Sequence, residues 1–255
     1  MTWCKVRLSE RVGRAVDEWT EPGQPAQAGK DTRIAGSGPY AVMPHPTDGS
    51  VWYTLNIFAG TPGFLRFDPK TKLSEFYAIP KEGIGVRGGD IDKNGVVWGS
   101  GSNGTLISFD RRKCKGQLNG PAATGNHCLE GFASYKYPGP AFEGFENGSA
   151  EASYYTWVDQ HNTVGLGENV PISTANLNDG FAALKDGQMI MLRIPYPLSF
   201  FAKGLDGRID DPNAGWKGRG LWSTNGDRTP WLKEGGKGSK PRAVHIQVRP
   251  DPLAH

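Results

Sequence analysis

The residues best placed for acid–base chemistry are His161 and Asp159, in the segment TWVDQHNTVG at residues 156–165. On an extended strand, side chains two positions apart point to the same face. A carboxylate on that face can orient an imidazole and raise its basicity, which produces a general base. We therefore predict Asp159 and His161 as a catalytic pair. The alternative is that both only satisfy backbone groups of a loop.

A second candidate group is GWKGRG at residues 215–220, which places an aromatic face beside two cations between glycines. This combination suits a sugar or an anion, and we predict Trp216 and Arg219 as ligand-binding residues. The alternative is that the segment only covers the edge of a sheet. The carboxylates just before it, at residues 206–211, do not have the spacing of an EF-hand loop. We interpret them as a turn stabilised by Asp side chains.

The cysteines carry one structural prediction. Cys114 and Cys128 bracket a segment rich in Gly, Pro and Asn, which has little else to fix its shape. A disulfide at this spacing stabilises a fold by about 3 kcal/mol and persists in oxidising compartments. The alternative is two unrelated thiols. We predict no metal site at these cysteines, because the adjacent His127 lacks the usual ligand spacing.

A repeat organises the elements that must position these residues. DGSVW at residues 48–52 recurs as NGVVW at residues 94–98, and FLRFDPKT at 64–71 recurs as LISFDRRK at 106–113. Weaker copies begin at YYTW, residues 154–157, and at GLWSTN, residues 220–225. The Asp-Gly and Asn-Gly pairs tolerate the positive φ angles of type I′ hairpin turns. The alternating strands beside them predict small antiparallel sheets.

Turn–strand modules of about 40–50 residues that recur along a chain indicate a β-propeller. We predict an all-β fold of four to five irregular blades, with blade-like units at about 39–80, 85–140, 150–197 and 200–252. Residues 1–38 would form an N-terminal segment or a partial blade. The blade number is low for a closed ring, so the chain is either an irregular small propeller or the C-terminal part of a longer one.

The blade pattern DGSVWYT…FLRFDPKT…EF…IP, clearest over residues 39–80, resembles the repeat of the streptogramin (virginiamycin B) lyase-like propellers. The resemblance implies a propeller fold and a periplasmic or extracellular location. It also implies a lyase that opens a cyclic ester by elimination, with a general-base His and a Mg²⁺ ion held by acidic side chains.

This chain departs from that pattern at the catalytic positions. Where the family has a Pro-His pair, the first two repeats have Pro39-Tyr40 and Val86-Arg87. The positions where an acid is expected hold Leu55, Gly101, Gln160 and Asn225, and none of these side chains can hold Mg²⁺ as a carboxylate does. Arg87 is then the third polar residue of a candidate catalytic group with His161 and Asp159, and Tyr40 is a candidate ligand contact.

Composition excludes several other classes. The 255 residues include 36 Gly, 19 Pro and 8 Trp at a formal net charge of +3, which argues against long helices and against disorder. The Lys and Arg residues form no stripe of the kind that binds nucleic acid. The most apolar stretch, residues 189–202, is too short for a membrane span and contains Arg193 and two prolines. Motifs of nucleotide-binding loops, zinc proteases and serine hydrolases are absent from the sequence.

Two functions therefore stand as hypotheses. One is a streptogramin lyase-like enzyme that acts on a cyclic ester or glycan-like substrate in the propeller funnel. The other is a non-catalytic propeller, expected to be a monomer, that binds a carbohydrate, a peptide or a partner protein through loops bearing Trp and Arg.

Overall fold

The computed structural model describes residues 39–55, 61–71, 73–80, 84–118, 123, 125–141, 143–144, 146, 148–195, 200–226 and 240–253. Within these residues the protein is all-β, with four antiparallel sheets of three or four strands and only short 3₁₀ helices. This confirms the predicted fold class, because consecutive antiparallel sheets of this size are the blades of a propeller. The N-terminal segment 1–38 lies outside the described residues.

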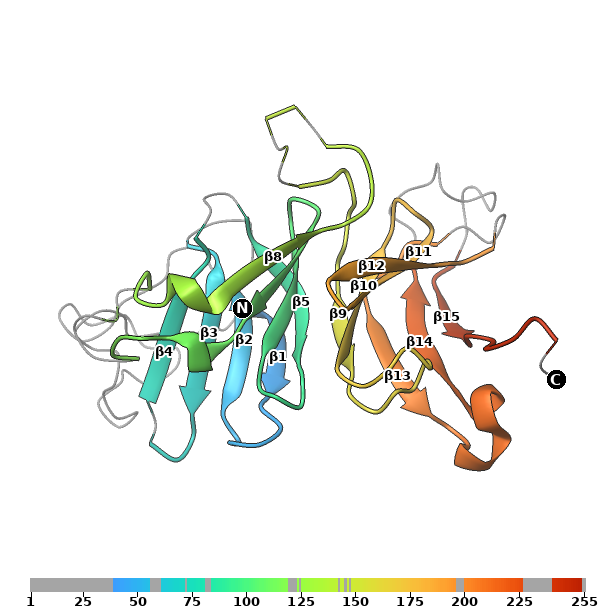
Figure 1. Cartoon of the computed structure of the whole chain (residues 1–255), viewed down its shortest axis with the longest axis horizontal. Helices are drawn as coiled ribbons and strands as arrows, with labels where there is room; N and C mark the ends of the chain where they lie inside the picture. Colours follow the sequence, from blue (N-terminus) through green and yellow to red (C-terminus); the bar gives the residue numbers. More distant parts are fainter. Residues whose placement is uncertain are drawn as a thin grey trace. The chain divides into compact units, whose positions relative to one another are not determined.

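The chain divides into two compact units, and two sheets fall mainly in each, with parts of β7 and β8 across the division. The first unit is Met1–Ser102 with Ile107–Ser134, and the second is Asn103–Leu106 with Tyr135–His255. In the first unit the strands follow the orders β1-β2-β3-β4 and β5-β6-β7-β8, so that each sheet is a simple meander (Figure 1). Their bounds are β1 Pro39–Pro44, β2 Val51–Leu55, β3 Gly63–Asp68, β4 Leu73–Ala78, β5 Val86–Ile91, β6 Val97–Gly101, β7 Thr105–Phe109 and β8 Phe132–Lys136.

The second unit holds a four-stranded sheet, β9-β10-β11-β12, and a three-stranded sheet, β13-β14-β15. Their bounds are β9 Thr156–Asp159, β10 Val170–Ala175, β11 Gly180–Lys185, β12 Gln188–Arg193, β13 Leu205–Ile209, β14 Arg219–Asn225 and β15 Arg242–Ile246. In both units the first strands of the two sheets pack together, β1 against β5 and β9 against β13. Each of the four sheets lies within one of the predicted blade-like units.

The repeated Gly residues bend the first connection of each of the first two sheets. Gly49 has φ +75° and Gly95 has φ +80°, as predicted for these positions. The connections are longer than type I′ turns, however, because β1 ends at Pro44 and β2 begins at Val51. A two-residue turn with positive φ at both positions occurs instead at Asp186-Gly187, between β11 and β12.

The tryptophans of the repeat are equivalent in three sheets and displaced in one. Trp52, Trp98 and Trp222 all lie on the second strand of their sheets. Trp157 lies instead on β9, the first strand of the third sheet, so aligning it with the others was wrong. The loop that follows it therefore leaves the opposite end of the sheet from the loops that follow β2, β6 and β14.

The core of the first unit is aromatic. Trp52 is 1% exposed and stacks on Tyr77, with the ring centroids 5.9 Å apart, and Tyr77 lies 4.4 Å from Phe109. Trp52 comes from the first sheet and Phe109 from the second, so these rings bury the facing sides of two neighbouring blades. A separate cluster in the second unit gathers around Ile172, Phe181, Phe200 and Leu221.

Two of the strands lie in segments without a clear strand pattern. β8 follows the Gly- and Pro-rich segment between Cys114 and Cys128, and β13, with the sequence LDGRI, begins where the sequence predicted a turn. The Gly- and Pro-rich segment before β8 is closed by a disulfide between Cys114 and Cys128, whose Cα atoms are 5.0 Å apart. The disulfide links the 3₁₀ helices η3 (Arg111–Lys113) and η4 (Leu129–Gly131) at their adjoining ends.

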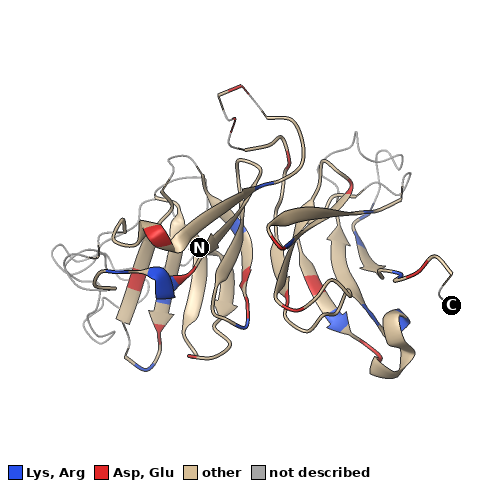
Figure 2. Ribbon diagram, in the orientation of Figure 1, with Lys and Arg blue, Asp and Glu red and all other residues tan. Residues whose placement is uncertain are grey.

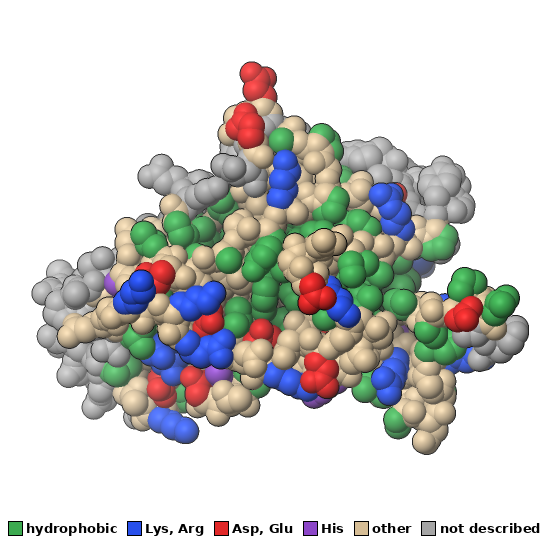
Figure 3. Space-filling model, in the orientation of Figure 1, with side chains coloured by type: hydrophobic (Ala, Val, Ile, Leu, Met, Phe, Trp, Pro, Cys, Tyr) green, Lys and Arg blue, Asp and Glu red, His purple; other side chains and the backbone are tan. Residues whose placement is uncertain are grey.

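The charged residues are dispersed. Figure 2 shows Lys, Arg, Asp and Glu scattered along the described chain, and on the face drawn in Figure 3 basic and acidic side chains are intermixed. Among the described residues, no helix is long and apolar enough to span a membrane.

Candidate functional site

The predicted site residues fall into two groups by unit. Tyr40 lies on β1 and Arg87 on β5, both in the first unit and both half-buried. Asp159, His161, Trp216 and Arg219 all belong to the second unit. The role predicted for each remains a prediction, and the geometry of the second unit shows which of them come together.

Asp159 is a buried residue that organises a loop. It ends β9 with no exposed surface, and its carboxylate accepts three backbone hydrogen bonds. The N–H groups come from His161 at 3.3 Å, Thr163 at 2.7 Å and Val164 at 2.9 Å. Asp92 has the same position after β5, where its carboxylate accepts the N–H groups of Asn94 and Val96. This loop-stabilising role is the alternative that the sequence left open for Asp159.

His161 does not share a strand face with Asp159. β9 ends at Asp159, and the chain turns at residues 160–161, so the alternation expected of an extended strand stops before the histidine. The His161 side chain is exposed, and its backbone N–H is the group that meets the Asp159 carboxylate. The expectation of a shared face was therefore wrong.

The loop held by Asp159 continues through residues 162–166 and has an unusual backbone. Asn162 adopts φ +54° and Gly165 φ +83°. The Asn162 side-chain oxygen accepts the N–H of Gly167 at 2.8 Å, and Lys185 donates to the carbonyl of Leu166. Thr163 and Val164 are buried, which fixes the loop against the body of the unit.

The second loop of the site is the 3₁₀ segment η5 (Pro212–Gly218), between β13 and β14. Asp211 caps its start by accepting the N–H of Asn213 at 2.9 Å, as predicted for an Asp-stabilised turn. The turn predicted for residues 206–209 was wrong, because these residues belong to β13. Gly218 ends η5, and this position requires glycine because a Cβ atom there would lie 1.7 Å from the carbonyl oxygen of Asp211. The geometry places Trp216 and Arg219 at the end of this loop.

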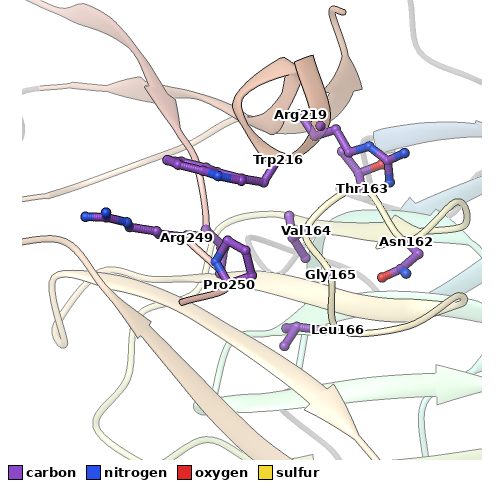
Figure 4. Close-up of a pocket in the computed structure, with 11 residues that line it drawn as sticks. Asn162, Thr163, Val164, Gly165, Leu166, Trp216, Arg219, Arg249 and Pro250 are labelled. Atoms are coloured by element: carbon purple, nitrogen blue, oxygen red, sulfur yellow. The ribbon is translucent and has the colours of Figure 1, made fainter. Parts of the chain in front are cut away.

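These two loops, with the segment after β15, enclose a hollow of about 450 Å³. We call it the Trp216 hollow, and it is lined by residues 162–166, Gly215, Trp216, Arg219 and residues 248–250. Figure 4 shows the Arg219 guanidinium beside Thr163, with the Trp216 ring, Arg249 and Pro250 toward the other side. The structure thus brings together the predicted residues Trp216 and Arg219 and the loop that follows His161. Its volume is in the range of small-molecule sites.

The electrostatics of the Trp216 hollow are cationic. Two arginines line it, and no Asp, Glu or His is among the described lining residues. The buried Nε of Arg219 has no hydrogen-bond acceptor in the described part of the chain. The ammonium group of Lys217 lies over the Trp216 ring, 5.8 Å from its centroid. Sequence reasoning missed Arg249, whose only signal was its place in VRPDP after the last strand.

The residues of the hollow do not fit Mg²⁺, the ion that the lyase resemblance implies. Arginines repel a divalent cation, and magnesium requires oxygen ligands, usually carboxylates. Elsewhere in the described ranges, no three His, Cys, Asp or Glu side chains are grouped so that they could hold a metal ion.

His45, in the connection between β1 and β2, has a mostly buried ring. Its side chain is 12% exposed, and Nδ1 accepts hydrogen bonds from the backbone N–H groups of Thr47 and Asp48. On its other side the ring abuts the turn of the next sheet, because a Cβ on Gly95 would lie 2.5 Å from Nε2. Burial lowers the pKa of His45 below 6.5.

Comparison with known proteins gives likenesses in structure only. No family model matches the sequence, and no curated protein matches it. The structure is similar to virginiamycin B lyase from Staphylococcus aureus, with 13% identity and a TM-score of 0.48 over 98% of this chain and 71% of that one. It is also similar to a streptogramin B lyase, with 16% identity and a TM-score of 0.49 over 89% of this chain and 61% of the lyase.

A protein of unknown function from Bacteroides caccae has 14% identity and a TM-score of 0.52, over 88% of this chain and 69% of that one. At these identities the likeness concerns the fold alone. The enzymes named among these structures belong to the family that the blade repeat resembles, and no activity is transferred from them to this chain.

Proposed function

We propose that this protein is a non-catalytic β-propeller that binds a carbohydrate in the Trp216 hollow. The observation that carries the proposal is the joining of one aromatic ring, two arginines and a rigid backbone loop around a single cavity. Flat aromatic faces with a few fixed polar groups are the usual composition of such sites. No described lining residue is a carboxylate or imidazole that could exchange a proton at neutral pH, so the hollow suits binding better than acid–base catalysis.

The test is ligand binding with and without the aromatic wall. The wild-type protein is titrated with a panel of oligosaccharides by calorimetry, and its melting temperature is followed in parallel, since a ligand that binds the folded state raises it. Trp216→Ala should abolish the binding. Trp222→Ala is the matched control, because Trp222 lies on β14 and does not line the hollow. If no oligosaccharide binds, or if both variants bind equally well, the proposal is wrong.

The second candidate is the lyase activity that the blade repeat of residues 39–80 resembles. In this proposal His161 would be the general base that opens a cyclic ester, on the loop that the Asp159 carboxylate holds. The experiment measures turnover of a cyclic depsipeptide lactone in the presence of magnesium, with His161→Ala as the comparison. Turnover that is lost in the variant supports the candidate, and turnover that is absent or unchanged rejects it.

We further propose that the protein acts as a monomer in an oxidising compartment, the periplasm or the cell exterior. The disulfide between Cys114 and Cys128 supports this location, because such bonds persist where thiols are not kept reduced. Fractionation of the native host tests the location, and light scattering of the purified protein tests the monomer.

A further inference from the structure

The guanidinium of Arg219 is the group in the Trp216 hollow that needs a partner most. The side chain is half-buried, and its Nε is covered and has no acceptor among the described residues. Buried polar groups in folded proteins are nearly always hydrogen-bonded, and a charged donor has the largest need. Arg112 meets that need internally, with Nε donating to the carboxylate of Asp110 at 2.8 Å. The Nε of Arg66 also lacks an acceptor, but the terminal nitrogens of Arg66 bind Glu75 and Asp48.

The surroundings of Arg219 reinforce its charge. Arg249 lines the same hollow, and none of the described lining residues is acidic. The Asp159 carboxylate already accepts hydrogen bonds from the backbone N–H groups of Thr163 and Val164 in the loop that lines the hollow. A ligand that enters the hollow therefore meets the Arg219 guanidinium, and none of the described lining residues is an acid that would compete with it.

The opposite side of the hollow is aromatic. Figure 4 shows the Trp216 ring and the Arg219 guanidinium on different sides of the hollow, with Pro250 near the ring. A ligand that uses both sides must carry an apolar face for the ring and an anionic group for the guanidinium. Uronic acid residues carry both, because the pyranose ring has a C–H face and its carboxylate can accept two parallel hydrogen bonds from an arginine.

We propose that the ligand of the Trp216 hollow is an acidic saccharide, whose carboxylate binds Arg219 while a sugar ring stacks on Trp216. The inference rests on the proposed carbohydrate binding and adds the chemical class of the ligand. A single-stranded nucleic acid also combines anions with stacking rings. It is disfavoured because the hollow offers one aromatic ring, and basic residues form no stripe along the described chain (Figure 2).

The experiment compares matched acidic and neutral sugars. Trimers of galacturonate and mannuronate are titrated beside trimers of galactose and mannose, using the whole wild-type chain at low and high salt. The acidic trimers should bind at least tenfold more tightly than their neutral counterparts. Arg219→Gln should remove at least tenfold of the affinity for the acidic trimers and leave that for the neutral ones unchanged. Arg208→Gln is the matched control, because this exposed arginine pairs with Asp206 on β13, outside the hollow.

The outcomes separate this inference from the function on which it rests. Neutral trimers that bind as well as acidic ones, or an Arg219→Gln variant with wild-type affinity, overturn the acidic ligand and leave carbohydrate binding in place. An oligothymidylate that displaces the acidic trimer also overturns it. Failure of every sugar to bind overturns both. A thermal melt of Arg219→Gln shows whether the variant is folded, and Arg219→Lys should recover part of the affinity if charge is what matters.

Discussion

The Arg111 guanidinium donates two hydrogen bonds to the Glu75 carboxylate, from Nε to Oε2 at 2.6 Å and from Nη2 to Oε1 at 2.7 Å. Glu75 lies on β4 at the outer side of the first sheet, and Arg111 follows β7 of the second sheet. The same carboxylate accepts the Tyr77 hydroxyl at 2.6 Å and Arg66 Nη1 at 3.3 Å. Burial, together with the charge of Glu75, raises the pKa of Tyr77, so the phenol keeps its proton and donates it.

This arrangement predicts that Glu75→Gln strongly destabilises the protein. Glu75 is 1% exposed, and without its charge the buried guanidinium of Arg66 and the half-buried one of Arg111 lose their shared counter-ion. Breaking a buried ion pair by removing one partner costs about 3–5 kcal/mol. Urea unfolding measures the free energy of unfolding, and the exposed Glu143→Gln is the control for the same chemical change. A loss below about 1 kcal/mol would contradict the prediction.

The disulfide near this ion pair predicts a second stability effect. Cys114 follows η3, which carries Arg111, so the bond restricts the chain next to the contact between the two sheets. Replacing both Cys114 and Cys128 by Ala should lower the free energy of unfolding by about 3 kcal/mol. A reductant should lower the stability of the wild type to that of the double variant and should not change the variant. A reductant effect of equal size in both proteins would point to another cause.

The sequence predicted the parts of the fold that depend on local signals. Asp48-Gly49 and Asn94-Gly95 turn the chain where expected. β13 was missed because LDGRI has a central glycine and charged residues, so no alternation marks it. Its strand conformation depends on pairing with β14, which the sequence does not display.

The candidate site was only partly predictable for the same reason. Trp216 and Arg219 stand close together in the sequence, and their chemistry could be read directly. Arg249 and the loop of residues 162–166 reach the same hollow only through the packing of different sheets. The role of Asp159 could have been found by aligning Val158-Asp159 with Ile91-Asp92, since both aspartates stand where the first strand of a sheet ends.

The buried ring of His45 predicts loss of stability in mild acid. Burial lowers its pKa in the folded protein, and Arg66 and Arg111 lower it further against the opposing effect of Asp48. In the unfolded chain a histidine takes up a proton near pH 6.5, so below that pH the unfolded state binds more protons. The stability that His45 contributes is therefore complete above about pH 6.5 and is lost as the pH falls through the lowered folded pKa.

The measurement is the melting temperature at about pH 7.5 and about pH 5.5, on either side of the ordinary histidine pKa. The wild type should melt at a lower temperature in acid, and His45→Asn should show a smaller drop, because its side-chain oxygen can accept the same N–H groups without titrating. The pKa of His127 is also lowered by burial, and this histidine is still present in the variant, so part of the drop in melting temperature should remain. Equal drops in the two proteins would assign the acid sensitivity to groups other than His45.

Replacing Asp159 and replacing His161, the two residues predicted as a catalytic pair, should have very different effects on stability. Asp159→Asn turns one acceptor oxygen into a donor facing backbone N–H groups, which should cost about 1–3 kcal/mol. It should also weaken ligand binding, because the loop of residues 162–166 loses its anchor. His161→Ala removes an exposed side chain and should change stability by less than about 0.5 kcal/mol. Paired unfolding and binding measurements test this, and equal effects of the two substitutions would contradict the loop-anchoring role.

The contact between β9 and β13 gives the last prediction. Gly207 on β13 lies under the ring of Trp157 on β9, and a Cβ there would be 2.1 Å from Cη2 of the indole. Gly207→Ala should therefore force the tryptophan aside and cost about 1–3 kcal/mol. Gly226→Ala is the control, because a Cβ at that position meets nothing within 4 Å. Combining Gly207→Ala with Trp157→Leu should recover part of the loss, since the two residues contact each other and their effects are not additive. Additive losses in the double variant would show that the indole does not limit the space at Gly207.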